Sequence, residues 1–286
     1  MNFASQNSVC IDIEKVIYDK SPRLAKSLPG FVIRYLKRVL HQDQINKSLL
    51  DNKDVMGLDF VRNILREFNA SIYVSGLENL PESGRYIVVS NHPLGGLDGL
   101  ALMHVVGKVR RDIIFPVNDF LLYLPNLKEL FIPINKVGKN TENAAKIESA
   151  FESDKIILYF PAGLCSRKIN GKICDLEWEK TFISKARKYN RDIIPVFIDA
   201  ENSNFFYRLA NIRKKLGIKA NIEMLYLVDE MYKQYNKKIN IIFGEKIPVS
   251  FFTKDKKDNE WAAYVKEWVY SLKKNKENNV FKSVEI

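Results

Sequence analysis

Short runs of aliphatic and β-branched residues alternate with amphipathic segments from about residue 86 onward, and this alternation limits most strongly which folds the chain can adopt. Six of these runs are predicted as strands, at 86–90, 112–117, 130–134, 155–160, 192–198 and 239–243. Most are continuously apolar, as expected of strands that are covered on both faces. Helix-like segments lie between them, at 97–106, 142–151, 176–189 and 205–216. Alternating strands and helices predict an α/β fold with a largely parallel central sheet flanked by helices.

The chain on either side of this alternation is predicted to be helical. Residues 1–70 are expected to form an N-terminal helical extension, interrupted at Ser21-Pro22. Residues 71–250 are expected to form the α/β domain, and residues 251–286 a C-terminal helical tail that frays after Lys273. Because no repeat or low-complexity linker is present, we expect one domain with a helical extension rather than an array of domains.

The net charge narrows the possible binding partners, and the cysteine content narrows the possible cellular compartments. The 286 residues include 45 Lys and Arg against 34 Asp and Glu, and the net charge of +11 favours nucleic acid, an acidic lipid surface, a phosphorylated substrate or an acidic carrier protein. Three cysteines, an odd and sparse set, argue against a disulfide framework and favour a reducing compartment. No apolar run reaches the roughly 18 residues of a membrane span, and no signal peptide is recognisable. We expect a cytoplasmic protein that is peripherally associated with the inner face of the cell membrane.

His92 is the histidine best placed for chemistry. It follows the predicted strand at 86–90, at the carboxyl end of the strands, where ligands of α/β sheets bind. Asp98 lies six positions later, beyond a turn that contains Gly95 and Gly96. Its carboxylate can therefore reach Nδ1 of His92 and leave Nε2 as a general base. The alternative is that Asp98 only caps the following helix, and the spacing alone leaves both interpretations open.

A second turn follows the strand that ends at Phe160. The Phe160-Pro161-Ala-Gly163 turn is predicted to expose backbone N–H groups at the sheet edge, where they can hold a developing oxyanion or a phosphate. Ser166 and Arg167 follow directly and can add charge-assisted contacts. Taken alone, this segment is better explained as an ordinary β-turn with a solvated basic end.

The motifs are more specific in combination than singly. Asn91-His92 with the downstream Asp98, then the Phe-Pro-x-Gly turn, then Ile194-Pro-Val-Phe-Ile198 occur in the order of one family. The chain resembles the glycerolipid acyltransferase superfamily and, more narrowly, its hemolysin-like branch, which includes ornithine- and glycine-lipid acyltransferases. The resemblance covers roughly residues 70–250.

This resemblance implies an acyltransferase. A fatty acyl group would move from a thioester donor, acyl carrier protein or acyl-CoA, to the hydroxyl or amine of a lipid precursor, with amino acids among the candidate acceptors. His92 would be the general base and Asp98 its orienting partner, and no metal or other cofactor would be required. The resemblance places substrate-binding roles on Asn91, Gly95, Gly96, Phe160, Pro161, Gly163, Ser166, Arg167, Lys136 and Pro195.

The chain departs from the family pattern on the side that holds the acceptor phosphate. The spacing between the motif histidine and aspartate is one residue longer than usual, and Ala162 replaces the glutamate of the Phe-Pro-Glu-Gly turn. Leu164 and Cys165 replace the threonine and arginine that usually follow, and Lys136 is the nearest cation in a block that usually ends in arginine. We therefore expect an acceptor with less phosphate character. The alternative within the family is a 1-acylglycerol-3-phosphate O-acyltransferase.

A covalent mechanism and a nucleic-acid-binding function are also compatible with the residues. Cys165, if it lies near His92, would allow a covalent, thioesterase-like route. A basic nucleic-acid-binding protein also fits the net charge and the 13 Tyr and 17 Phe available for stacking. Because the chain lacks zinc-finger spacing, an RNP-like strand and an arginine-rich arm, nucleic acid is not the expected partner.

Two basic amphipathic segments, at 29–40 and 205–219, are the expected contacts with an anionic lipid surface. The alternative is that their apolar stripes belong to the core and their lysines form a solvated face. An acidic acyl carrier protein would be attracted by the same charge.

Overall fold

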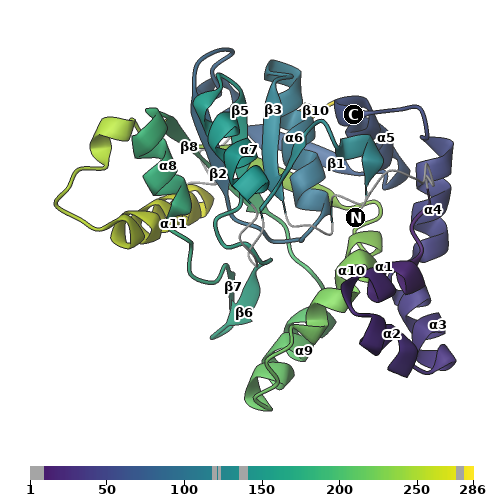
Figure 1. Ribbon diagram of the computed structural model, residues 1–286. Coiled ribbons are helices and arrows are strands. Elements are labelled where there is room, and N and C mark those ends of the chain that lie inside the picture. The colour runs from purple at the N-terminus through teal and green to yellow at the C-terminus, as the bar shows by residue number, and fades with distance from the viewer. Residues whose placement is uncertain (1–9, 118–120, 122–123, 135–140, 275–279) are drawn as a thin grey trace.

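The computed structural model describes residues 10–117, 121, 124–134, 141–274 and 280–286. Within these ranges the main sheet has eight strands in the order β10-β1-β9-β8-β2-β5-β3-β4 (Figure 1). The strands are β1 (Ser71–Ser75), β2 (Tyr86–Ser90), β3 (Ile113–Val117), β4 (Phe131–Pro133), β5 (Ile156–Tyr159), β8 (Asp192–Asp199), β9 (Lys238–Phe243) and β10 (Lys282–Val284). Neighbouring strands are parallel except for β8 with β9 and β1 with β10, which confirms the predicted largely parallel sheet.

Helices cover both faces of this sheet. On one face lie α5 (Gly57–Glu67) and α6 (Leu97–Val109), and on the other lie α7 (Thr141–Glu152), α8 (Thr181–Tyr189) and α11 (Asp258–Lys274) (Figure 1). Because α6 is enclosed by the sheet and α5, most of its residues are buried, including His104. The α/β architecture with flanking helices is therefore confirmed.

The N-terminal helical extension is present. It contains α1 (Ile13–Lys20), α2 (Pro22–Ser27), α3 (Gly30–Val39) and α4 (Gln42–Asp51). The hydroxyl of Ser21 accepts a hydrogen bond from the backbone N–H of Leu24 at 3.3 Å, so the predicted break is the N-terminal cap of α2. The helix α5 also precedes residue 70, yet it packs into the main core against α6. The boundaries at 70 and 250 remain predictions.

Four elements, β6 (Arg167–Ile169), β7 (Lys172–Cys174), α8 and β10, correct the sequence analysis, and β1 was not predicted as a strand. Residues 167–174 form a separate hairpin of β6 and β7, and the following helix α8 begins at Thr181 rather than Leu176. The tail contains a strand as well as a helix, because β10 pairs antiparallel with β1 and closes that edge of the sheet, while residues 275–279, where the helix was expected to fray, lie outside the described residues. A strand edge with unpaired backbone groups is a strong site for such pairing, and hydropathy alone does not show it.

The carboxyl ends of β2, β5 and β8 lie at one edge, because these strands are parallel neighbours. The segments that leave this edge lead into α6, into the β6–β7 hairpin and into α9 (Asn204–Lys215), which is followed by α10 (Leu227–Tyr232) (Figure 1). This edge is where ligands of α/β sheets bind. No helix in the described ranges combines the length and the apolar character needed to cross a bilayer.

Candidate active site

His92 and Asp98 meet at this edge of the sheet. Nδ1 of His92 lies 2.9 Å from Oδ2 of Asp98. Oδ2 also accepts the backbone N–H groups of Leu94 at 2.8 Å and Gly95 at 3.3 Å, and Oδ1 accepts that of Gly99 at 2.9 Å. Asp98 sits in the first turn of α6, where the helix dipole favours an anion. The structure therefore decides between the two interpretations left open by the spacing: Asp98 contacts the imidazole, whereas the N-cap residue of α6 is Gly96.

Phe160 contacts the ring of His92, and Asp175 and Ser166 contact its backbone. The ring of Phe160 stacks on the imidazole with centroids 4.2 Å apart and an interplanar angle of 19°. The backbone N–H of His92 donates to the carboxylate of Asp175 at 3.3 Å, and its carbonyl accepts the N–H of Ser166 at 2.7 Å. The side chain is 17% exposed, and the described residues leave Nε2 without a hydrogen-bond partner. Nε2 is thus the ring atom available to a substrate.

The electrostatics of this pair suit a base. Burial by itself lowers the pKa of His92, but the charge and the hydrogen bond of Asp98 outweigh it, so the pKa of His92 is raised above its ordinary value. Burial would raise the pKa of Asp98, but His92 and the N–H groups of Leu94 and Gly95 lower it below its ordinary value. Asp98 therefore stays ionised and stabilises the imidazolium that forms when Nε2 accepts a proton.

The two glycines of the His92 loop shape the turn. Gly95 has φ of 83°, and a Cβ atom at this position would lie 2.8 Å from Cδ2 of Leu227 in α10. Only glycine fits both the left-handed backbone and this close approach. Gly96 is the N-cap residue of α6. Both residues therefore allow the Asp98 carboxylate to fold back, while their predicted contact with substrate remains a prediction.

Asn91 holds two strand ends together. Its Nδ2 donates to the carbonyl of Ile198 at 2.9 Å, and its Oδ1 accepts the N–H of Ile198 at 2.7 Å, so both ends of the buried amide are engaged by β8. Pro195 lies within β8 opposite Val89, and its carbonyl accepts the N–H of Gly244 at 2.8 Å. The structure makes Pro195 part of the sheet interior, away from the cluster around His92, and its predicted role in lining the substrate site stays a prediction.

The Phe160–Gly163 turn lies beside His92, but one of its amides is engaged. Gly163 is exposed with φ of 61°, and its N–H donates to the carbonyl of Phe160 at 3.1 Å. Pro161 is buried, and its carbonyl accepts the N–H of Glu179 at 3.0 Å. The amide of Gly163 therefore closes the turn, the ring of Phe160 contacts His92, and the predicted contact of this turn with substrate remains a prediction.

Ser166 and Arg167 point into the protein instead of into solvent. The Ser166 hydroxyl donates to Oδ1 of Asp175 at 2.5 Å. The Arg167 guanidinium is buried and donates to Oε1 of Glu223 at 2.8 Å, and Arg213 forms an ion pair with the same carboxylate. Arg167 is thus engaged inside the protein, in a buried cluster in which it and Arg213 share the carboxylate of Glu223. Lys136, the other predicted cation, lies outside the described residues.

Cys165 lies next to the site but is poorly suited to act as a nucleophile. Its side chain is fully buried, and Sγ lies 3.2 Å from Nη1 of Arg167. Burial raises the pKa of the Cys165 thiol to about 12, which the nearby Arg167 charge only partly offsets. Because a protonated and inaccessible thiol is a weak nucleophile, the geometry favours direct transfer over a covalent route.

Sequence reasoning missed Asp175 and Trp178. Both are buried, and Nε1 of Trp178 donates to Oδ2 of Asp175 at 2.9 Å. A signal was present: Asn170-Gly171 adopts positive φ at both residues, as a two-residue hairpin turn requires, and Asp175 directly follows the second strand of that hairpin. The predicted helix from Leu176 concealed it.

Comparison with known proteins finds relatives along nearly the whole chain. The family model described as acyltransferase matches residues 15–279. The lyso-glycine lipid O-acyltransferase of Bacteroides thetaiotaomicron is 48% identical over 264 residues, which are 92% of this chain and 97% of that protein. The protein of the same name from Phocaeicola vulgatus is 47% identical over 264 residues, which are 92% of this chain and 95% of that protein.

A solved structure is also similar. The crystal structure of the 1-acyl-sn-glycerophosphate acyltransferase PlsC from Thermotoga maritima matches 75% of this chain and 81% of that chain, with a TM-score of 0.44 and 18% identity. The family match and the two full-length relatives carry the assignment. The chain belongs to the acyltransferase family, within the glycerolipid acyltransferase superfamily that its motifs predicted, and is an enzyme.

Proposed function

We propose that this protein transfers a fatty acyl group from a thioester donor to the hydroxyl of a lyso-glycine lipid, with His92 as general base. The observation that carries the proposal is the His92–Asp98 pair, which leaves only Nε2 free in a chain that belongs to an acyltransferase family. The names of the two relatives support this acceptor, and "O-acyltransferase" favours a hydroxyl over an amine. Acyl carrier protein and coenzyme A are both candidate carriers.

The proposed transfer is direct. Nε2 of His92 accepts the acceptor's hydroxyl proton while the oxygen attacks the thioester carbonyl carbon, and the carbonyl oxygen becomes an oxyanion. Asp98 holds Nδ1–H and stabilises the imidazolium. When the tetrahedral intermediate collapses, the carbon–sulfur bond breaks, and Nε2–H returns its proton to the leaving thiolate. The products are an ester and a free thiol, so the balance requires no metal and no redox cofactor.

The acceptor is tested with purified protein. Lyso-glycine lipid and lysophosphatidate are each supplied with acyl carrier protein thioester or acyl-CoA, with and without a chelator, and products are measured by mass spectrometry. We expect faster acylation of the lyso-glycine lipid, because both relatives are named for this acceptor and the buried Arg167 is engaged by Glu223 inside the protein. We also expect no effect of the chelator. Equal or faster acylation of lysophosphatidate would support the 1-acylglycerol-3-phosphate alternative and overturn the proposed acceptor.

The rate is expected to depend on pH through His92. Only the neutral imidazole accepts a proton, and the pKa of His92 is raised above its ordinary value of 6.5 by Asp98. The profile of kcat/KM should therefore rise with pH and level off, with a midpoint above 6.5. The measurement is kcat/KM for the preferred acceptor from about pH 5 to 9. A midpoint at or below the ordinary value would contradict the assignment of His92 as the base.

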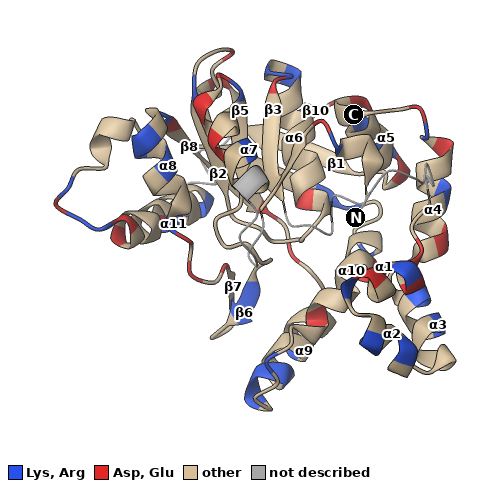
Figure 2. Cartoon of the chain, viewed as in Figure 1, with Lys and Arg blue, Asp and Glu red and all other residues tan. Residues whose placement is uncertain are grey.

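We further propose that the enzyme docks on an anionic membrane through one edge of the molecule, here named the basic apolar edge. Its apolar side chains are Phe31, Ile169, Ile212, Leu216 and Ile218, and its basic side chains are Lys172, Lys214, Lys215 and Lys219, all of them exposed. They come from α3, the β6–β7 hairpin and the end of α9, which project on one side of the sheet, where Lys and Arg gather (Figures 1 and 2).

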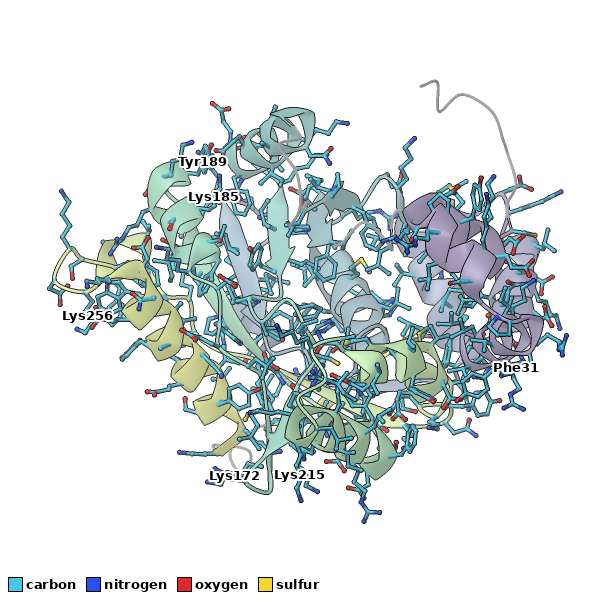
Figure 3. The ribbon with its side chains drawn as sticks, turned by 60° about the horizontal axis from the view of Figure 1, so that its bottom comes forward. Phe31, Lys172, Lys185, Tyr189, Lys215 and Lys256 are labelled. Atoms are coloured by element: carbon cyan, nitrogen blue, oxygen red, sulfur yellow. The ribbon has the colours of Figure 1, made fainter. Side chains whose placement is uncertain are left out.

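The hairpin and α9 lie side by side, whereas Phe31 of α3 lies apart from them (Figure 3). The hairpin and α9 are joined by a hydrogen bond from Nδ2 of Asn211 to the carbonyl of Lys168 at 3.2 Å, and Lys172 and Lys215 lie together in Figure 3. The hairpin follows the turn at Phe160, and α9 follows β8, so both segments begin at the edge of the sheet where His92 lies. Apolar side chains framed by lysines suit an anionic bilayer, with the apolar groups below the headgroups. Docking here would bring a lipid acceptor to His92.

The docking proposal is tested by replacing Lys214 and Lys215 with serine. Each basic residue near an anionic surface contributes about 1 kcal/mol, so binding should weaken by roughly thirtyfold. Sedimentation with vesicles of equal parts phosphatidylglycerol and phosphatidylcholine measures this effect. The matched control replaces Lys108, at the far end of α6, and Lys155, directly before β5, because both lie toward the amino ends of the strands. Equal losses in both double variants would contradict docking by this edge.

A further inference from the structure

Asp175 ties three segments of the site together. Its buried carboxylate accepts the Ser166 hydroxyl at 2.5 Å, the Trp178 indole N–H at 2.9 Å and the backbone N–H of His92 at 3.3 Å. Its own backbone N–H donates to the Tyr270 hydroxyl of α11 at 2.7 Å. One acid thereby connects the loop after β2, the turn after β5, the exit of the β6–β7 hairpin and the helix α11.

The backbone of His92 is consequently fixed at both polar groups. Its N–H is held by Asp175, and its carbonyl accepts the N–H of Ser166, whose hydroxyl donates to the same Asp175. These bonds form a closed loop of three residues around the peptide groups of His92. Asp98 and Phe160 hold only the ring, so the position of Cα, from which the ring extends, depends on Asp175 and Ser166.

We propose that Asp175 is a positioning residue for His92, which fixes the backbone of the base and places a second negative charge beside its imidazole. The inference rests on the proposed role of His92. It predicts that loss of the carboxylate makes His92 less basic, an effect that a carboxylate with a purely structural role would not produce.

The charges that face His92 come from three elements. Asp98 approaches from α6, Asp175 from the end of the hairpin, and Arg167 from β6, where its positive charge opposes the two acids. Cys165 is near but neutral, since burial raises its thiol pKa to about 12. Tyr270 and Lys266 face Asp175 from α11. Nζ of Lys266 donates to the backbone carbonyl of Asp175 at 2.7 Å. Within this set Asp175 raises the pKa of His92.

The hydrogen-bond donors around the Asp175 side chain favour the ionised carboxylate. Burial raises the pKa of Asp175 above its ordinary value, and the hydrogen bonds of Ser166, Trp178 and the His92 amide offset only part of this shift. Two of these three partners are N–H groups that can only donate, so a carboxylate satisfies them better than a protonated acid does.

The test is a titration of His92 by NMR in Asp175→Asn, which keeps the shape and removes the charge. The chain has three histidines, so labelled histidine gives three ring signals, and His41→Gln and His104→Gln assign the other two. An opposite charge within a few ångströms shifts a pKa by about one unit or more. We expect the His92 pKa in Asp175→Asn to fall by about one unit and the acid limb of kcat/KM to move to lower pH with it.

Trp178→Phe is the matched control, because it removes one donor to Asp175 and keeps both the ring and the charge. Its His92 pKa should stay within about 0.3 units of the wild-type value. An unchanged His92 pKa in Asp175→Asn, or an equal fall in Trp178→Phe, would overturn the inference. Asp175→Ser tests the same expectation if the amide variant does not fold. Because the titration requires no turnover, it tests the effect of Asp175 on the His92 pKa even if the proposed acceptor or reaction is wrong.

Discussion

Replacement of His92 by alanine is expected to lower kcat/KM for acyl transfer by about 10²–10⁴-fold, the range that general-base catalysis supplies. Without Nε2, the acceptor hydroxyl must attack the thioester while it still carries its proton. The remaining groups of the site still bind the substrates, so KM should change less than kcat. Initial rates of ester formation at saturating donor, measured by mass spectrometry, give both constants.

The His92→Ala protein should remain folded. Asp98 keeps the N–H groups of Leu94, Gly95 and Gly99, and the loss of ring stacking on Phe160 removes about 0.5–1.5 kcal/mol. His104→Gln is the control: this histidine lies buried in α6, and its Nε2 contacts the carbonyl of Glu285 at 3.0 Å, remote from the loop. A folded His92→Ala enzyme with at least a tenth of the wild-type rate would exclude His92 as the base.

Replacement of Asp98 by asparagine is expected to lower kcat by about 10²-fold or more, up to the ~10⁴-fold seen when a Ser-His-Asp triad loses its aspartate charge. The amide cannot match all four donors that face the carboxylate: if its oxygen takes the place of Oδ2, its NH₂ meets the N–H of Gly99. The imidazolium also loses its stabilising charge. The measurements are kcat and the pH midpoint of kcat/KM, which should move to lower pH.

Asp112→Asn provides the matched control for Asp98→Asn. Asp112 also pairs with a basic group, Arg110 at 2.6 Å, but it lies directly before β3, at the amino ends of the strands. We expect its kcat to stay within about twofold of the wild-type value, because Asp112 is partly exposed and lies at the edge of the sheet opposite to His92, although Arg110 is buried. Equal activities of Asp98→Asn and the wild type would show that the contact with Nδ1 has no catalytic consequence.

Six of the eight strands of the main sheet, and their order along the chain, were predictable because burial on both faces leaves a local signature, whereas β1 and β10 were not predicted. The segment at 86–90 matches β2, and 192–198 falls one residue short of β8. A strand that forms only because another strand offers it an unpaired edge leaves no such signature in its own sequence. The strand β10 has only three residues and exists because β1 offers an unpaired edge, which no local pattern records.

The contacts of the site divide in the same way into short-range ones, which the sequence predicted, and long-range ones, which it did not. The contact between His92 and Asp98 joins residues six positions apart across one turn, so local sequence was enough to predict it. Asp175 lies 83 positions from His92, and Arg167 lies 56 positions from Glu223. Whether these charged groups face a substrate or each other depends on how the hairpin and α9 pack, and the sequence analysis therefore misplaced Ser166 and Arg167 on the solvent side.

The sequence alone determined the layered α/β fold, the family and the histidine–aspartate pair, because periodicity, strand-end turns and short-range spacing are properties of adjacent residues. The tertiary structure decided which polar groups are free. Buried polar groups must find partners, and those partners come from distant segments of the chain. For that reason Asn91, Ser166 and Arg167 are engaged within the protein, whereas Nε2 of His92 is left for the substrate.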